Sequence, residues 1–454
     1  MMLSFIISSL ATSTQRFFSY SWGKNDINEI KAIFSNALGM HLLLSVLLTA
    51  VLLIAEHTIV HDYMRISPDR IESADFVYYT IVMVLVLTLM TAPVKAIFIA
   101  RENIVYASCV DIFDSVLKLI GAMILTFITF DSLIVYSLMM VFISMFTFLA
   151  YAVYAFIKYE ECHIPRFSDF SSEKIRQLFS FATWNLYAIG STVVRTQGLS
   201  IVLNKFLGTI INASYGLALQ VSGAATSIAS SILNAMNPQL MKAEGRGDRV
   251  MMLQYTTKES KYSYLMLSCF LIPIVIEMPS LLTLWLKEYP PYTVEFCRMV
   301  IISTIFDQAT IGLTSANQAK GNIRNYSLIT GTIRLITIPS AWICLNLHLG
   351  ILWFIGSYLF FEVICGLSRI PLIKYTAGLD VTNYCKEVFL RPLWPIAGNI
   401  LVCLAIYHII DATWRFMITE MVGILVAMVL TYFLSLDRSE RSWVLHQIIH
   451  RKND

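Results

Sequence analysis

Charged residues and catalytic motifs are both scarce in this sequence. Only 14% of the residues are Asp, Glu, Lys or Arg, against roughly 25% in soluble domains. There is no GxxxxGKS or GxxxxGKT motif, which argues against ATP binding through a P-loop. No HExxH, DxD-type pair or CxxC occurs, and the eight cysteines mostly lie inside apolar runs. We therefore expect no catalytic residues, no metal site, no cofactor and no disulfide framework.

What the chain has in abundance is apolar surface. Hydrophobic residues make up 57% of the sequence, and the mean hydropathy is +0.67. This composition is typical of a polytopic membrane protein. The net charge of +3 is small and spread over many loops, so no nucleic-acid partner is indicated. The first apolar run lacks a basic n-region and a cleavage site, so no secretory signal peptide is evident.

Thirteen apolar segments are long enough to cross the hydrocarbon core of a bilayer. We predict an all-α protein with membrane-spanning helices over residues 2–22, 38–56, 76–96, 105–128, 132–157, 179–202, 209–238, 262–286, 296–317, 326–346, 351–373, 392–410 and 417–436. The loops alternate in basic content: one alternate set holds 22 lysines and arginines and the other holds 6. Cytoplasmic loops carry the excess, which makes the C-terminus cytoplasmic and places Met1 on the outer side.

The chain also repeats itself at a nearly constant offset. Residues near the end of the first span recur 222 positions later, near the end of the seventh: Ser8, Ser9, Gly23 and Asp26 match Ser230, Ser231, Gly245 and Asp248. A looser echo pairs Tyr106 with Tyr326. Parallel repeats of one orientation are typical of two-halved transporters.

The repeat suggests a division into two pseudo-symmetric bundles. We predict an N-terminal bundle of five spans over 1–158, a cytoplasmic linker over 159–178 and a C-terminal bundle of six spans over 179–373. Two additional spans follow over 374–436, and a cytoplasmic tail over 437–454. Because the first bundle is one span short of the second, we expect its first helix to precede Met1 and to be missing from this chain.

Two spans carry unusual polar faces. In the first, Tyr187, Ser191 and Arg195 recur at i, i+4 and i+8; in the second, polar and small residues recur on one face at Gln220, Gly223, Ser227, Ser230, Asn234 and Asn237. A helix does not turn such a stripe toward acyl chains, because unsatisfied polar groups are costly there. The stripe either packs on other helices or lines a substrate path, in which case Gln220 and Asn234 are candidate substrate contacts.

Of the 33 lysines and arginines, 28 fall in the loops counted above and five do not, namely Arg16, Lys118, Arg195, Arg334 and Arg369. A charge at mid-bilayer costs roughly 2.5–3.5 kcal/mol, so each needs a partner, water or a ligand. The first four are candidate substrate contacts, although Arg16 can snorkel and Lys118 can pair with Asp114 one turn earlier. Arg369 is interpreted as an interfacial anchor.

Acidic and histidine residues give fewer candidates. Asp307 and Glu362 lie inside spans and are the candidates for ion coupling. His57 and His61, like His446 and His450, have a helical i, i+4 spacing that suits a metal ion, but they lie in a loop and a polar tail and are interpreted as surface histidines.

Four stretches of the chain resemble one transporter family. They are ATSTQRFFSYSWGKND, FATWNLYAIGSTVVRTQGLSIVLNKFLG, INASYGLALQVSGAATSIASSILNAMNPQLMKAEGRGD and TSANQAKGNIRNYSLITG. The chain resembles the polysaccharide-biosynthesis flippases, the Wzx-type O-antigen translocases of the multidrug/oligosaccharidyl-lipid/polysaccharide exporter superfamily. The resemblance implies two six-helix bundles around a V-shaped central cavity, usually with two extra C-terminal helices, which is the basis for expecting fourteen helices.

The resemblance also implies a task. Such a protein moves a lipid-diphosphate-linked oligosaccharide across the bacterial inner membrane by alternating access, for surface lipopolysaccharide biosynthesis. Cavity arginines would neutralise the diphosphate. The implied partners are the lipid-linked oligosaccharide, the bilayer, and a polysaccharide polymerase and glycosyltransferases, around a monomer.

Two other functions compete with this one. A multidrug or organic-cation antiporter of the same superfamily should have an acid-rich cavity, whereas the deep charges here are mostly basic. A membrane-embedded glycosyl- or acyltransferase would need a catalytic carboxylate or histidine cluster on a loop, and the sequence offers none.

Overall fold

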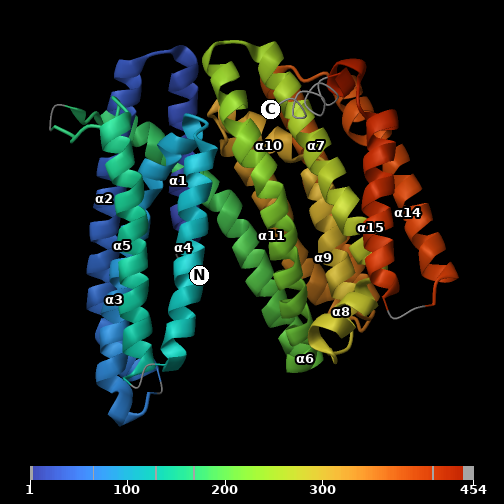
Figure 1. Cartoon of the computed structure of the whole chain (residues 1–454), viewed down its shortest axis with the longest axis horizontal. Coiled ribbons are helices and arrows are strands. Elements are labelled where there is room, and N and C mark those ends of the chain that lie inside the picture. Colours follow the sequence, from blue (N-terminus) through green and yellow to red (C-terminus); the bar gives the residue numbers. More distant parts are fainter. Residues whose placement is uncertain (1–3, 65, 128–129, 167–168, 412–413, 443–454) are drawn as a thin grey trace. The chain divides into compact units, whose positions relative to one another are not determined.

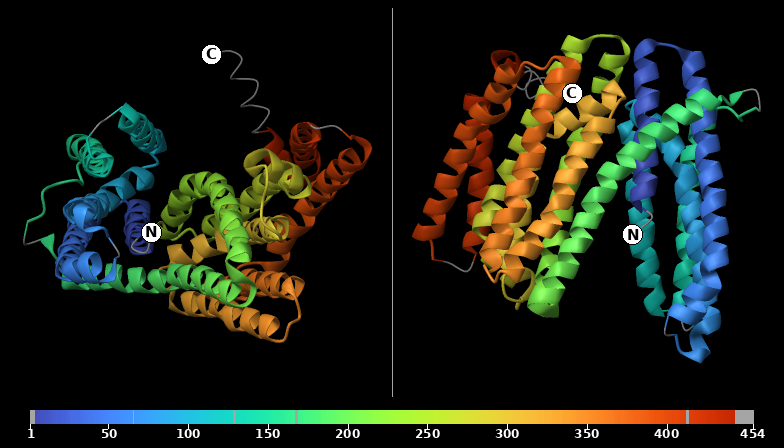
Figure 2. Two further views of the ribbon diagram at one scale, coloured as in Figure 1. Left: turned by 90° about the horizontal axis from the view of Figure 1, so that it is seen from below. Right: turned by 180° about the vertical axis from the view of Figure 1, so that it is seen from behind.

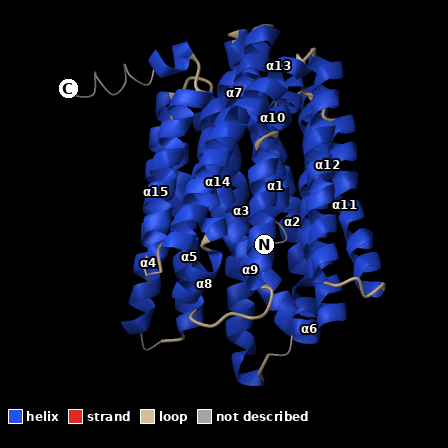
Figure 3. Ribbon diagram, turned by 90° about the vertical axis from the view of Figure 1, so that its right-hand side faces the viewer, coloured by secondary structure: helices blue, strands red, loops and turns tan. Residues whose placement is uncertain are grey.

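The regular structure of the protein is helical throughout its described part. A computed structural model describes residues 4–64, 66–127, 130–166, 169–411 and 414–442, and these ranges contain no strand (Figure 3). Nine helices of these ranges are long and apolar enough to cross a membrane, and the bent pair α9 (Thr293–Gln308) and α10 (Ile311–Lys320) makes a tenth. The predicted fold class, an all-α polytopic membrane protein, is confirmed.

Each of the 13 predicted spans is mostly helical where its residues are described, with breaks at Glu277 and at Ala309 and Thr310. The first five are α1 (Ser4–Lys24), α2 (Ile27–His57), α3 (Ile71–Ala100), α4 (Ile104–Ile124) and α5 (Ser132–Lys158). Two share α6 (Ser172–Gly245), and the next two are the pairs α7 (Arg249–Ile276) with α8 (Met278–Leu286) and α9 with α10. The last four are α11 (Arg324–Asn346), α12 (Ile351–Ala377), α14 (Arg391–Ile409) and α15 (Arg415–Leu430).

Short helical turns connect some of these spans. They are η1 (Thr58–Tyr63) and η2 (Pro68–Arg70) before α3, η3 (Leu125–Phe127) after α4, α13 (Val381–Cys385) and η5 (Lys386–Leu390) before α14, and η6 (Thr431–Ser435) after α15.

Three helices extend well beyond their predicted apolar spans. α2, α6 and α7 begin 11, 7 and 13 residues before the predicted starts at 38, 179 and 262. The added segments of these helices hold many polar and charged residues, so a search for apolar segments misses them. The start of α2 is capped by Asp26, whose carboxylate accepts a hydrogen bond from the Glu29 N–H at 2.9 Å. The predicted loop 23–37 therefore shortens to a tight turn.

A single glycine divides the 74 residues of α6 into two helices. Gly208 has φ 84° and ψ 176°, a backbone conformation that is open to glycine and strained for other residues. Across the break, the Ser200 hydroxyl donates a hydrogen bond to the Asn212 side-chain oxygen at 2.7 Å. This break lies in the predicted loop 203–208, so the two spans predicted there form a helical hairpin.

The chain folds into two compact units. Unit 1 comprises residues up to Leu186 together with Met241–Asp248, and unit 2 comprises Tyr187–Leu240 with the chain from Arg249 onward. In unit 1, α3 packs against α1, α2, α4 and α5 (Figure 1). The ring of Phe98 lies in the core of this unit, stacked on Tyr106 with ring centroids 5.1 Å apart.

Unit 2 is built around α7, α9 and α12. Its aromatic core centres on Phe296, whose ring makes edge contacts with Tyr215 at 5.8 Å and Phe354 at 5.9 Å. The two C-terminal spans, α14 and α15, pack on each other and on α7, as Figure 2 also shows for the orange and red segments. They therefore extend unit 2 rather than forming a separate body.

The sequence repeat has a structural counterpart within unit 1. A Cβ atom on Gly23 would lie 2.2 Å from the Lys242 carbonyl oxygen, and one on Gly245 would lie 2.1 Å from the Tyr20 carbonyl oxygen. The two repeat-related glycines thus allow the ends of α1 and α6 to pack backbone against backbone. Neither position accepts a side chain without separating the helices.

Candidate functional site

Five charged side chains converge in the interior of unit 2. Arg195 of α6 donates to Glu362 of α12 at 2.6 Å. Arg334 of α11 reaches Asp307 of α9 at 3.2 Å and lies 3.8 Å from the second oxygen of Glu362. Arg369 of α12 also pairs with Asp307. We call Arg195, Asp307, Arg334, Glu362 and Arg369 the arginine cluster.

Hydroxyl and aromatic groups hold these guanidiniums in place. Arg195 stacks on the ring of Tyr358, 4.8 Å from its centroid. Arg334 donates to the Thr192 hydroxyl at 2.9 Å, and Arg369 donates to the Thr310 hydroxyl at 3.1 Å. Thr310 lies at the 48° bend between α9 and α10. The bend therefore supports the cluster by presenting this hydroxyl next to the last turn of α9.

The arginine cluster carries an excess of positive charge. Its three arginines face two carboxylates, so its formal charge is +1 when all five groups are ionised. The Nε donors of Arg195, Arg334 and Arg369 have no hydrogen-bond acceptor among the described residues. Buried donors are normally satisfied; the second carboxylate oxygen of Glu362 also lacks a partner there, so unmet donors outnumber unmet acceptors in the cluster.

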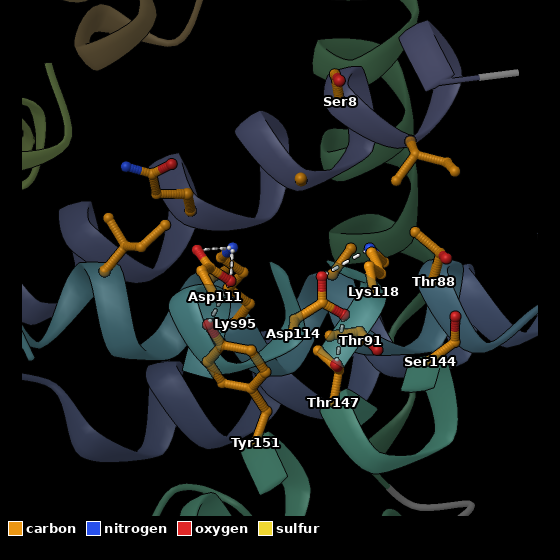
Figure 4. A pocket seen from close by; sticks show the side chains of 16 residues that line it. Ser8, Thr88, Thr91, Lys95, Asp111, Asp114, Lys118, Ser144, Thr147 and Tyr151 are labelled. Atoms are coloured by element: carbon orange, nitrogen blue, oxygen red, sulfur yellow. Dashed lines mark hydrogen bonds and ion pairs between the residues drawn. The ribbon is translucent and has the colours of Figure 1, made fainter. Parts of the chain in front are cut away.

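A second polar site is a cavity of about 400 Å³ within unit 1. Figure 4 shows two ion pairs side by side, one between α3 and α4 and one within α4, with Ser8 of α1 across from them. Lys95 of α3 binds both oxygens of Asp111, at 2.8 and 2.7 Å. Lys118 binds Asp114 one turn earlier, at 2.6 Å. We call this cavity the unit 1 pocket.

The carboxylates of the unit 1 pocket are also fixed by hydroxyl groups of α5. The Thr147 hydroxyl donates to Asp114 at 2.9 Å, and the Tyr151 hydroxyl donates to Asp111 at 3.0 Å. Tyr151 is fully buried, so it orients Asp111 but offers no ring face to a ligand. Each carboxylate is thus held by one ammonium and one hydroxyl.

The polar stripe of α6 faces away from the core of unit 2. Gln220 and Asn234 are exposed, as are Gly223, Ser227 and Ser230. Ala225 and Ala229, on the other side of the same helix, are buried in the core. The hydroxyls of Ser227 and Ser230 donate back to carbonyl oxygens of their own helix. The stripe therefore does not act as packing between the helices of unit 2.

Arg16 of α1 lies in a smaller cavity of unit 1. Its guanidinium is 4.5 Å from the ring centroid of Phe17 and 4.7 Å from that of Tyr20. The side chain is buried, and Lys24 and Lys174 line the same cavity. The aromatic contacts stabilise the charge by cation–π attraction.

The structure corrects one residue assignment and adds others. The interpretation of Arg369 as an interfacial anchor is wrong: it is buried and ion-paired, because α12 continues about two turns beyond it to Ala377. The predicted pairing of Lys118 with Asp114 is confirmed. Lys95 is a pocket residue that the sequence did not single out; the apolar run that follows it is the signal that α3 continues to Ala100.

The remaining candidates are placed but not tested. Arg195 and Arg334 come together in the arginine cluster with both acids predicted to couple ions, Asp307 and Glu362. Substrate binding by Arg16, Lys118, Arg195, Arg334, Gln220 and Asn234 stays a prediction, as does ion coupling. An ion at Asp307 or Glu362 would compete with the arginines already bound there.

One histidine has acidic neighbours that the sequence did not suggest. The His61 Nε2 atom lies 3.2 Å from Asp75 and 3.9 Å from Glu56, and candidate ligand atoms of these three residues lie within 4.8 Å of one another. His57 stacks on His61, with ring centroids 4.9 Å apart. His446 and His450 lie outside the described residues.

Comparison with solved structures identifies the fold. A MATE in complex with MaL6 is similar over 82% of this chain and 85% of its own, with a TM-score of 0.72 and 14% identity. A MOP superfamily transporter from Pyrococcus furiosus, described as having a binding pocket of reverse polarity, is similar over 83% and 85%, with a TM-score of 0.71 and 14% identity. The chain has the fold that these transporters share.

A third example is similar to the same extent. An outward-facing multidrug resistance MATE family transporter matches 82% of this chain and 84% of its own, with a TM-score of 0.71 and 14% identity. No family model and no curated protein sequence matches the chain. The similarity to these solved structures therefore lies in the three-dimensional arrangement of the helices and not in the sequence.

Proposed function

We propose that this chain translocates a lipid-diphosphate-linked oligosaccharide across the bacterial inner membrane by alternating access, for surface polysaccharide biosynthesis. The observation that carries the proposal is the +1 charge of the arginine cluster together with its three unused Nε donors. A diphosphate is anionic and accepts several hydrogen bonds, and guanidinium groups match phosphate oxygens in geometry. A cation would meet an unfavourable field at this cluster.

The exposed polar stripe of α6 is suited to contact the oligosaccharide part of the substrate. Gln220 and Asn234 offer amide donors and acceptors on a surface that hydrocarbon would not solvate. A glycan needs such groups to replace the water it loses. The stripe carries no charge between these two residues, which suits sugar hydroxyls.

The decisive experiment removes the gene from the native cell. Accumulation of the complete lipid-linked oligosaccharide on the cytoplasmic side, with loss of the surface glycan, is the expected result. Complementation with Arg195→Ala or Arg334→Ala should leave the protein in the membrane but fail to restore export. Arg438→Ala removes an exposed arginine outside the cluster and should restore export fully. Normal export in both cluster variants would refute the role of the arginines.

A multidrug or organic-cation antiporter is the second candidate, because the similar structures include multidrug MATE transporters. The carboxylates Asp111 and Asp114 are the groups of unit 1 that would attract a cation. Lys95 and Lys118 neutralise both of them, however. Hypersensitivity of the deletion strain to toxic organic cations, without any accumulated lipid-linked sugar, would favour this candidate. The transferase hypothesis is disfavoured because the fold is one of transporters.

The partners and location follow from the proposed substrate. The lipid-linked oligosaccharide and the bilayer are the immediate partners, a polysaccharide polymerase would consume the product, and glycosyltransferases would supply the substrate. The chain would act as a monomer with its C-terminus in the cytoplasm. Attachment of a reporter enzyme to the C-terminus would test this orientation.

A further inference from the structure

The unit 1 pocket combines hydroxyl groups with ion pairs on helices that are predicted to span the membrane. Four helices, α1, α3, α4 and α5, contribute to its wall. Its uncharged polar groups are Ser8, Gln15, Thr88, Thr91, Ser144 and Thr147. Its volume of about 400 Å³ falls in the range of roughly 300–1,000 Å³ typical of small-molecule sites.

The charges of the pocket are accessible as well as paired. The side chains of Asp111 and Lys118 are 51% and 44% exposed, although both lie inside the predicted span 105–128. Charged groups in a membrane span do not face acyl chains and instead mark ligand or ion paths. The exposed sides of these ion pairs are therefore available to a polar ligand.

The balance of charge selects the kind of ligand. Lys95 with Asp111 and Lys118 with Asp114 form two neutral pairs. An anionic ligand would meet the carboxylates and a cationic one the ammonium groups, so either would have to break a pair. A ligand whose groups both donate and accept hydrogen bonds can bridge each pair without breaking it. Sugar hydroxyls have this property.

The geometry of the carboxylates favours such binding in advance. Asp114 is held between the Lys118 ammonium at 2.6 Å and the Thr147 hydroxyl at 2.9 Å. A carboxylate has about four lone-pair sites, so these two contacts leave two of them for a ligand. Because partners on α4 and α5 fix its rotamer, little side-chain entropy is lost when a ligand binds.

We propose that the unit 1 pocket is a binding site for a neutral saccharide, with Asp111, Asp114 and Thr147 as hydrogen-bonding contacts. The inference rests on the proposed function only for the source of the saccharide, which would be one residue of the transported glycan. Apolar side chains of the wall, Ile7, Ala11, Ala92 and Ile99, would contact the C–H faces of the ring.

The test compares ligands of equal size and different charge. The full chain is placed in lipid nanodiscs free of glycoside detergent, and binding is measured by saturation-transfer NMR. The neutral probes are the methyl glycosides of glucose, N-acetylglucosamine and rhamnose. Glucose 1-phosphate and methyl glucosaminide are the anionic and cationic counterparts. The variants are Asp114→Asn and Thr147→Val, both close to isosteric. Ser115→Ala, on the same helix and outside the pocket, is the matched control.

We expect at least one neutral glycoside to bind the wild type and Ser115→Ala equally. Binding to Asp114→Asn and Thr147→Val should be about tenfold weaker, the effect of one lost hydrogen bond to a charged group. Both charged probes should bind more weakly than the neutral ones. The proposal is overturned if no neutral glycoside shows binding that depends on Asp114 and Thr147, or if a charged probe binds best.

The pocket assignment and the flippase proposal fail separately. If gene deletion accumulates the lipid-linked oligosaccharide but no glycoside binding depends on Asp114, the saccharide site is refuted and the flippase proposal stands. If Asp114-dependent glycoside binding is found while deletion accumulates no lipid-linked sugar, the saccharide site is supported and the flippase proposal fails.

Discussion

Replacing Glu362 by glutamine should destabilise unit 2 strongly. Glu362 is buried and faces Arg195 at 2.6 Å and Arg334 at 3.8 Å. The Glu362→Gln substitution raises the charge of the arginine cluster from +1 to +2, with Asp307 as its remaining acid. Breaking a buried ion pair in this way costs about 3–5 kcal/mol. For a unit of this size the loss lowers the Tm by roughly 6–20 °C.

A double-mutant cycle separates the ion pair from the loss of one side chain. Arg195→Gln combined with Glu362→Gln returns the cluster to +1, so the double variant should be more stable than the sum of the single effects indicates. We expect a coupling energy in the upper part of the range of about 0.5–3 kcal/mol for residues in contact. Tryptophan fluorescence during thermal unfolding, in one detergent for all variants, supplies the four Tm values.

A matched control removes an acid of the same unit from outside the cluster. Glu295 is exposed in the first turn of α9, and Glu295→Gln should change the Tm by little. Additive effects of the Arg195 and Glu362 substitutions would refute the reasoning, because the two groups would then not act as a pair.

Three further predictions concern packing, backbone and pH. Gly23→Ala places a Cβ 2.2 Å from a backbone carbonyl and should cost about 1–3 kcal/mol by overpacking, whereas Gly216→Ala, with nothing within 4 Å, should not lower the Tm. A Cβ atom at Gly208 would also have no atom within 4 Å, but the backbone φ there is +84°. Gly208→Ala should therefore cost roughly 1–3 kcal/mol of backbone strain, measured as a fall in Tm. Burial acts to raise the pKa of Glu440, but a tyrosine hydroxyl, a backbone N–H and the ammonium of Lys261 hold that pKa below its usual value. The stabilisation by the Glu440 carboxylate is present above the unfolded pKa of about 4.3 and is lost as pH falls through the lower folded value. Hydrogen-exchange protection of residues 437–442 should therefore fall on acidification of the wild type. In Glu440→Gln this protection should be low at both pH values.

The helices and their membrane class could be read from the sequence because their signals are local. A run of apolar residues of sufficient length predicts a span wherever it occurs, and all 13 predicted segments are mostly helical where described. The Lys118–Asp114 pair was predictable for the same reason, since i, i+4 residues meet on any helix. The turn at Gly208 likewise lies in a loop that the hydropathy pattern marks.

The partners of the deep charges were decided by the tertiary structure alone. Arg195 meets Glu362, 167 positions later in the chain, and Arg369 turns inward to Asp307, 62 positions earlier. Lys95 of α3 reaches Asp111 of the neighbouring helix α4. Sequence periodicity indicates which face of a helix is polar. It does not indicate which neighbouring helix that face contacts, because the contact depends on how the helices pack. Local hydrophobicity thus determined the spans. The packing of distant helices decided which charges are paired and which arginine Nε donors lack an acceptor among the described residues.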